Sequence, residues 1–104
     1  MDDIENQECV LNIRYDLPLE IWDKVMLVYE KMPGWLGYGK NGNGEEGIPY
    51  WFSFNESEKS IFASVEPGGL QIIGNMEEKE WSSWITEIKK NATKILGFKV
   101  VEIE

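Results

Sequence analysis

The amino-acid sequence predicts one α+β domain with the element order β-α-β-β-β-α-β, a mostly antiparallel sheet and two helices packed on one face of that sheet. Two long segments carry apolar residues at helical spacing, and the other apolar residues form short runs typical of strands. A chain of 104 residues has room for one core, which five Trp, four Tyr and four Phe can fill. The predicted domain spans residues 1–104.

The first third of the chain predicts a strand and a helix. Residues 1–8 carry four acids and no base, which indicates a solvated and mobile lead-in. Apolar side chains alternate over 9–15, as in a strand. Asp16 ahead of Pro18 is typical of a helix start, and the helix is expected to end at residues 33–34, Pro-Gly. The apolar stripe of this helix consists of Ile21, Trp22, Val25, Val28, Tyr29 and Met32.

The middle of the chain predicts a long loop and then an antiparallel meander. Residues 34–47 hold six of the ten glycines, and this segment is longer than a connection requires. Three β-prone runs follow at 48–54, 60–66 and 70–74, separated by turn-rich segments. These runs should pair as neighbouring hairpins.

The last third predicts a second helix and a short strand. Asn75, with Glu78 three residues further on, has the arrangement of a helix-capping pair. Gly97 stands where a helix C-terminus is usually capped, and residues 98–103 predict the last strand. The core-facing stripe of this helix consists of Trp81, Trp84, Ile85, Ile88, Ala92, Ile95 and Leu96.

Charge and cysteine content restrict the partners and the compartment. Nineteen Asp and Glu against ten Lys and Arg give a formal net charge of −9, which repels phosphate backbones and anionic lipids. Neither nucleic acid nor a membrane is therefore an expected partner. The longest apolar run, 25–29, is far below the ~20 residues of a membrane span, and the acidic N-terminus is unlike a signal peptide. With Cys9 as the only cysteine, the sequence predicts a cytoplasmic protein.

The absence of histidine restricts the chemistry. It removes the usual triad base and the usual zinc ligand, so catalysis would have to rest on carboxylates, Lys or Tyr. Residues 37–42 spell G-x-G-x-x-G, but a helix precedes them and a strand follows, the reverse of a dinucleotide site. The oxygens of 41–46 lack the frame of a calcium loop. The sequence predicts no cofactor and no metal, and it favours a protein that is not an enzyme.

An aromatic patch is predicted on the sheet face that the helices leave open. Strand alternation places Trp51 and Tyr50 on opposite faces. If both helices cover one face, then Trp51, Phe62 and Ile73 form an apolar patch on the other. Such patches are often interaction sites, although the long loop or the chain termini could cover this one.

Turn, tryptophan and glycine positions mark about the last forty residues: Ser64 to Leu70 (SVEPGGL), Trp81, Trp84, Ala92, Leu96 to Phe98 (LGF) and Glu102. This layout resembles the small acidic immunity proteins of bacterial polymorphic toxin systems, including contact-dependent growth inhibition. The resemblance implies a cytoplasmic protein that binds its cognate toxin and blocks it. It leaves the identity of the toxin open.

The charge favours a basic toxin domain as partner, and a nuclease fits because its cleft must be positive to hold phosphates. Carboxylates around an aromatic anchor would then occlude the active site. The predicted contacts lie on or near the loop and the meander: Glu45, Glu46, Trp51, Glu56, Glu58 and Glu66.

Two alternatives stay open. One is a small carboxylate-based enzyme, which would use a pair drawn from Glu45, Glu46 and Glu66 in a concave site. The other is an accessory subunit of a larger assembly. A toxin-like domain encoded by the neighbouring gene would favour the immunity function over both, and the sequence does not predict an oligomeric state.

Overall fold

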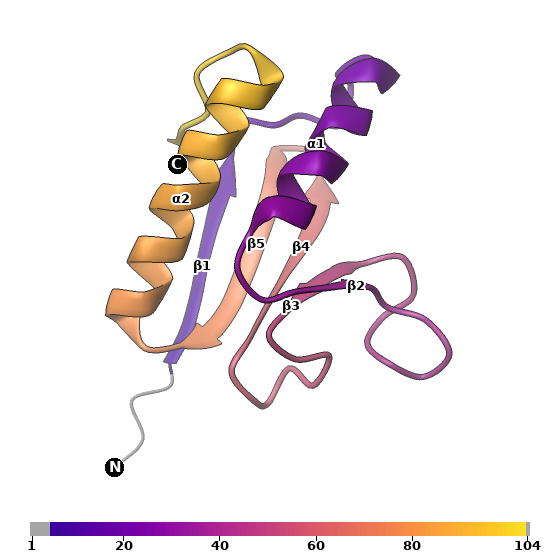
Figure 1. Ribbon diagram of the computed structural model, residues 1–104, viewed down its shortest axis with the longest axis vertical. Helices are drawn as coiled ribbons and strands as arrows, with labels where there is room; N and C mark the ends of the chain where they lie inside the picture. Colours follow the sequence, from indigo (N-terminus) through magenta and orange to yellow (C-terminus); the bar gives the residue numbers. More distant parts are fainter. Residues whose placement is uncertain (1–4, 104) are drawn as a thin grey trace.

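The computed structural model describes residues 5–103, which form a six-stranded sheet with two helices on one face (Figure 1). The spatial order of the strands is β2-β3-β4-β5-β1-β6, and every pairing between these strands is antiparallel. The elements are β1 (Glu5–Leu11), α1 (Leu19–Lys31), β2 (Trp35–Tyr38), β3 (Pro49–Trp51), β4 (Ser60–Glu66), β5 (Gly69–Met76), α2 (Glu78–Leu96) and β6 (Glu102–Ile103).

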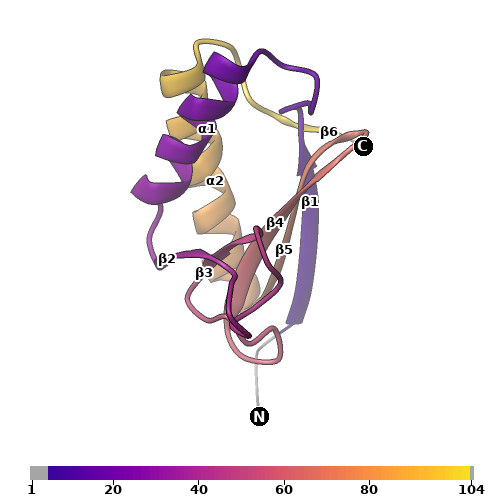
Figure 2. The same ribbon diagram turned by 90° about the vertical axis from the view of Figure 1, so that its right-hand side faces the viewer.

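The predicted α+β class, with its antiparallel sheet and both helices on one face, is confirmed. Figure 2 shows α1 and α2 together on one side of the sheet and no helix on the other side. The meander of three strands is confirmed as β3, β4 and β5. The structure adds β2, which lies inside the glycine-rich segment and pairs with β3 at the edge of the sheet.

The first strand lies earlier in the chain than its alternation predicts. A strand was expected over 9–15, whereas β1 runs from Glu5 and pairs with β5 along its whole length in one register. The lead-in predicted over 1–8 is therefore wrong from Glu5 onward, and residues 1–4 lie outside the described part of the chain. Polar residues such as Glu8 fit this strand because one face of an antiparallel sheet can point to water.

The predicted helix starts are wrong in detail, and the predicted end of the second helix is confirmed. Pro18 takes the N-cap position of α1 and Glu77 that of α2, and neither helix has a side-chain capping bond. Asn75, the expected cap, is a residue of β5, where strand pairing holds its backbone. Gly97 ends α2 with a left-handed φ of +88°, which glycine adopts without steric cost.

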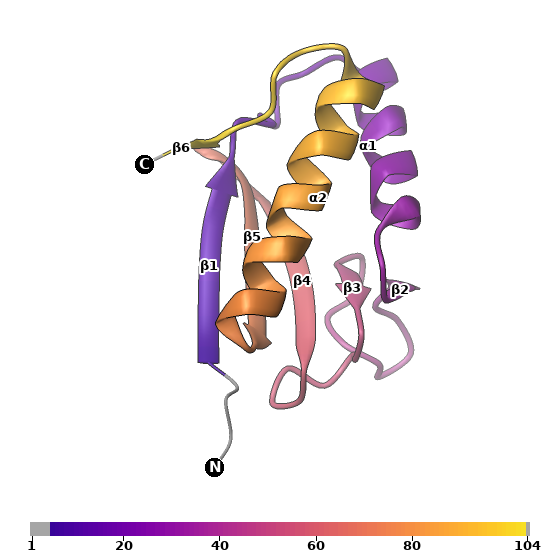
Figure 3. The same ribbon diagram turned by 60° about the vertical axis from the view of Figure 1, so that its left-hand side comes forward.

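The core lies between the helices and the sheet. Helix α2 packs over β1 and β5, and α1 packs beside α2 and against β2 (Figure 3). The predicted stripes supply the buried helical residues, among them Val25 and Val28 of α1 and Trp84 and Ile88 of α2. Because two amphipathic helices share one sheet face, their apolar stripes and that face exclude water together.

The placement of Trp51 on the open face is wrong. The register of β3 and β4 pairs Trp51 with Ile61 and Tyr50 with Phe62, and directly opposed side chains share a face. Trp51 is fully buried on the helix side, and Tyr50 joins Phe62 on the open side. The alternation then stops at Phe52, whose φ of +73° turns the chain.

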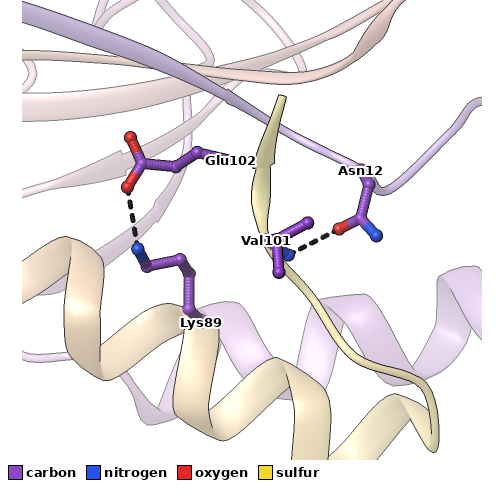
Figure 4. A network of polar contacts seen from close by, with 4 residues as sticks. All are labelled: Asn12, Lys89, Val101 and Glu102. Atoms are coloured by element: carbon purple, nitrogen blue, oxygen red, sulfur yellow. Dashed lines mark hydrogen bonds and ion pairs between the residues drawn. The ribbon is translucent and has the colours of Figure 1, made fainter. Parts of the chain in front are cut away.

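The C-terminal segment returns to the first strand and is tied there by polar contacts (Figure 4). The side-chain oxygen of Asn12 accepts a hydrogen bond of 2.8 Å from the backbone N–H of Val101. Glu102 forms an ion pair of 2.7 Å with Lys89 of α2. A strand was predicted over 98–103, and only β6 at its end pairs with β1.

Within residues 5–103, neither helix is long and apolar enough to cross a membrane.

Candidate functional site

Two adjoining hollows lie on the open face of the sheet, opposite the helices. The first has a volume of about 300 Å³ and the second about 210 Å³. Glu56, Phe62 and Ile73 line both hollows, so we treat the two as one site and call it the open-face groove. The first hollow is also lined by Asn6, Glu8, Ser60 and Asn75, and the second by Glu45, Ile48, Tyr50, Ser64, Glu66 and Gln71.

The floor of the groove is apolar and aromatic. Phe62 of β4 and Ile73 of β5 are paired neighbours, and both are partly exposed. Below them the ring of Tyr50 is fully buried, with its centroid 5.7 Å from that of Phe62. On the other side Tyr50 packs against Phe54, at 5.3 Å between centroids. These tilted ring contacts give the groove an apolar base.

The rim of the groove is acidic. The carboxylates of Glu8, Glu45, Glu56 and Glu66 stand on it, and all four residues are exposed. No Lys or Arg lines either hollow, and none of the ion pairs found within residues 5–103 involves these four residues.

Six of the ten basic residues lie on the helices. Four lysines lie on α2 and two on α1, and the other four bases lie in connecting segments. No base lies on a strand of the described sheet. The negative charge of the open face is therefore left without compensation from its own sheet.

One hydroxyl group holds two segments of the rim together. The Tyr50 hydroxyl accepts a hydrogen bond of 2.9 Å from the backbone N–H of Glu45 and donates one of 3.1 Å to Oε2 of Glu56. Gly44 lies against the Tyr50 ring, where a Cβ atom would stand only 2.6 Å from a ring carbon. Burial raises the pKa of Tyr50, the hydrogen bond from the Glu45 backbone N–H lowers it by less, and the Glu56 and Glu45 carboxylates raise it further. The hydroxyl therefore keeps its proton and stays a donor.

Neighbouring polar side chains orient the other rim carboxylates. Ser64 donates a hydrogen bond of 2.6 Å to Glu66, and Gln71 donates one of 2.8 Å to Glu8. The Asn75 side chain donates to the backbone oxygen of Glu56 at 3.1 Å. Because an ionised carboxylate accepts several hydrogen bonds, each retains acceptor capacity for a partner.

The structure brings together half of the predicted contact residues. Glu45, Glu56 and Glu66 line the second hollow. Glu46 and Glu58 are exposed in the adjacent loops and line neither hollow of the groove.

The structure places the predicted contact Trp51 on the helix side of the sheet and not on the open face. It has no exposed surface, because it packs edge-on against Trp84 at 5.0 Å between centroids and donates its indole N–H to the backbone oxygen of Tyr29. Trp51 therefore cannot contact a partner as an aromatic anchor while the domain is folded.

Sequence reasoning missed Tyr50 and Glu8. The alternation around residue 50 contained the signal for Tyr50, but the register of β3 and β4 was needed to choose the face. Glu8 was assigned to the lead-in, although it continues the alternation of Cys9 and Val10 toward the N-terminus.

Another hollow, of about 320 Å³, lies between α2 and Phe52 and contrasts with the groove. It also combines aromatic rings with two carboxylates, those of Glu80 and Glu87. Here, however, the chain supplies its own cation, because Lys59 pairs with Glu80 and holds its ammonium nitrogen 4.7 Å from the centre of the Phe52 ring. The charge of this hollow is partly compensated from within.

Among residues 5–103, no three His, Cys, Asp or Glu side chains are grouped so that they could hold a metal ion. Comparison of the chain with protein-family models, with curated proteins and with solved structures found no match. The candidate site therefore rests on its own geometry and charge.

Proposed function

We propose that the protein is a cytoplasmic immunity protein that binds a cognate basic toxin domain, a nuclease domain in particular, and neutralises it by occluding its active site. The observation that supports this function is the uncompensated negative charge of the open-face groove. Carboxylates surround an aromatic floor there, and no Lys or Arg lines the groove. Six of the ten basic residues lie on the helices.

The charges of the protein favour both the approach of a basic partner and the contacts made in the complex. A net charge of −9 attracts a basic partner over distances up to the Debye length, about 8–10 Å at physiological salt. At contact, carboxylates take positions that a substrate phosphate would take in a nuclease cleft, while Phe62 supplies a surface that excludes water. The resemblance of the last forty residues to immunity proteins points the same way.

The same groove bears on the enzyme alternative. Glu45 and Glu66, two of the three carboxylates considered for catalysis, line one hollow, and Glu46 does not. In a pair of catalytic carboxylates one member must hold a proton, which takes burial or a second carboxylate at close range. Both groove residues are exposed, so the geometry favours binding over acid–base catalysis. An accessory subunit would use the same face, and its partner would then be a permanent one.

The test is to purify the protein with the toxin-like domain encoded by the neighbouring gene. We expect a stoichiometric complex by calorimetry, loss of the toxin's nuclease activity in the complex, and weaker binding as salt rises from about 50 to about 300 mM. Absence of a complex at low salt would reject the proposed function. A complex that leaves the nuclease active would favour the accessory subunit.

A further inference from the structure

We infer that the open-face groove is a binding site for arginine side chains of the partner, with a guanidinium stacked on Phe62 and bound by the carboxylates of Glu56 and Glu66. This inference rests on the proposed function and adds the chemical group that is recognised and the place where it binds. It replaces the predicted aromatic anchor, Trp51, with a residue that is accessible.

The size of the hollows fits side chains. Pockets for small-molecule ligands usually measure ~300–1,000 Å³. The two hollows, at about 300 and 210 Å³, lie at or below the lower end of that range. Phe62 and Ile73 belong to both hollows, so one side chain can lie on each side of this pair.

The chemistry of the groove selects for arginine. A guanidinium is planar and weakly hydrated, so it stacks on an aromatic face more readily than the ammonium of lysine. Its fork of donors also matches a carboxylate with two hydrogen bonds. Phe62 supplies the ring, Glu56 and Glu66 line the same hollow, and Ser64 donates a hydrogen bond to Glu66.

The molecule contains an internal example of this combination. Lys59 stands over the ring of Phe52 and pairs with Glu80, so a cation, a ring and a carboxylate already meet on the helix side. The groove likewise combines a phenylalanine ring with carboxylates, and none of its lining residues is a base. A cation bound in the groove would therefore be supplied by a partner.

A second copy of this chain is a weaker candidate for the occupant. Two copies of charge −9 repel each other, and the helices of the second copy would offer lysines, which stack on rings less well than arginine. Self-association through the groove is nevertheless a distinct outcome of the test.

The test uses the whole protein and a blocked Gly-Arg-Gly-Arg-Gly peptide, with matched peptides that carry lysine or neutral citrulline. Backbone amide shifts of the protein locate the binding site. We expect shifts along β4 and β5, about threefold or more tighter binding of the arginine peptide than of the lysine peptide, and no binding of the citrulline peptide. Shifts confined to the helices, or equal binding of all three peptides, would overturn the inference.

A charge-matched pair of variants separates the groove from net charge. E56Q/E66Q and E30Q/E87Q both remove two negative charges, and the second pair lies on the exposed sides of α1 and α2. We expect E56Q/E66Q to weaken binding of the arginine peptide about tenfold and E30Q/E87Q less than about twofold. Equal losses in the two variants would overturn the inference. F62L should reduce the preference for arginine over lysine, and if F62L does not fold, the three-peptide comparison on the unaltered protein decides.

The outcomes distinguish the inference from the proposed function. If the arginine peptide binds the groove and the neighbouring toxin does not bind, only the proposed function fails. If the toxin binds equally well to E56Q/E66Q and E30Q/E87Q, the inferred arginine-binding site is refuted and the proposed function stands. A dimer by light scattering, with line broadening confined to β4 and β5, would assign the groove to a second copy and overturn the inference.

Discussion

Replacing Tyr50 by Phe tests whether one hydroxyl holds the acidic rim in place. The substitution keeps the buried ring and removes the oxygen that joins the backbone of Glu45 to the carboxylate of Glu56. A typical hydrogen bond contributes ~0.5–1.5 kcal/mol to stability, and one to a charged group ~1.5–3. Because Glu45 and Glu56 are exposed, water replaces most of what is lost. We therefore expect the free energy of unfolding to fall by about 1–2 kcal/mol.

The domain should remain folded, because small domains have ~5–15 kcal/mol of stability. At ~4–8 °C per kcal/mol for a domain of this size, the Tm should fall by about 4–16 °C. The rim segments then lose their common anchor, and affinity for the basic partner should fall about three- to tenfold. Differential scanning calorimetry and titration of the partner measure the two effects.

Tyr15→Phe is the matched control, because it removes the same group from a tyrosine that is 59% exposed. The control should change neither the Tm nor the affinity. If Tyr50→Phe behaved like the control in both measurements, then the Tyr50 hydroxyl would not organise the rim.

Alkaline pH provides an independent check on Tyr50. Its pKa is raised in the folded state, mainly by burial, above the ordinary value of about 10. The contribution of the protonated hydroxyl is thus complete below pH ~10, and it is lost as pH rises because the unfolded state releases its proton first. Burial also raises the pKa values of Tyr29 and Tyr38. The stability of Tyr50→Phe should therefore still fall above pH 10, but less steeply than that of the unaltered protein, as measured by urea unfolding at several pH values.

Three further predictions concern the core, the cysteine and the charge of the loop. Trp84→Ala should lower the free energy of unfolding by roughly 3–5 kcal/mol, because it empties a buried aromatic site, and an unchanged urea midpoint would contradict that. Burial raises the pKa of Cys9 to about 12, so its thiol should react slowly with Ellman's reagent at pH 8, and Cys9→Ser should change the binding free energy by less than about 1 kcal/mol. Reversing Glu45 and Glu46 to Lys changes the local charge by about four units, which should slow association about tenfold and flatten its salt dependence in stopped-flow experiments while the Tm stays constant. An unchanged on-rate would place the recognition surface elsewhere.

The sequence by itself determined the two helices and the class of the fold. The apolar stripes of α1 and α2 repeat every three to four residues, and this local pattern needs only one face to be buried. Gly97 marked the end of α2 for an equally local reason, because a left-handed φ is open to glycine. The net charge was also available from the sequence, but its distribution over the surface was not.

Tertiary structure decided which face each strand residue occupies. Alternation with a period of two divides a strand into two faces and does not say which one the helices cover, and a shift of one residue exchanges them. This is why Trp51 was expected outside and lies inside, while Tyr50 lies beside Phe62. Strand pairing likewise places Glu5 in the sheet, although the acidic composition of residues 1–8 predicts a solvated lead-in.

The candidate site depended on the same long-range pairings. Glu8 and Glu66 are far apart in the chain, and they stand on one groove because β5 pairs with both β1 and β4. Glu45 joins them because its loop is tied to Tyr50. Each carboxylate was visible in the sequence, but only the order and register of the strands could place them around one aromatic floor, since pairings between distant segments leave no periodic pattern in the chain.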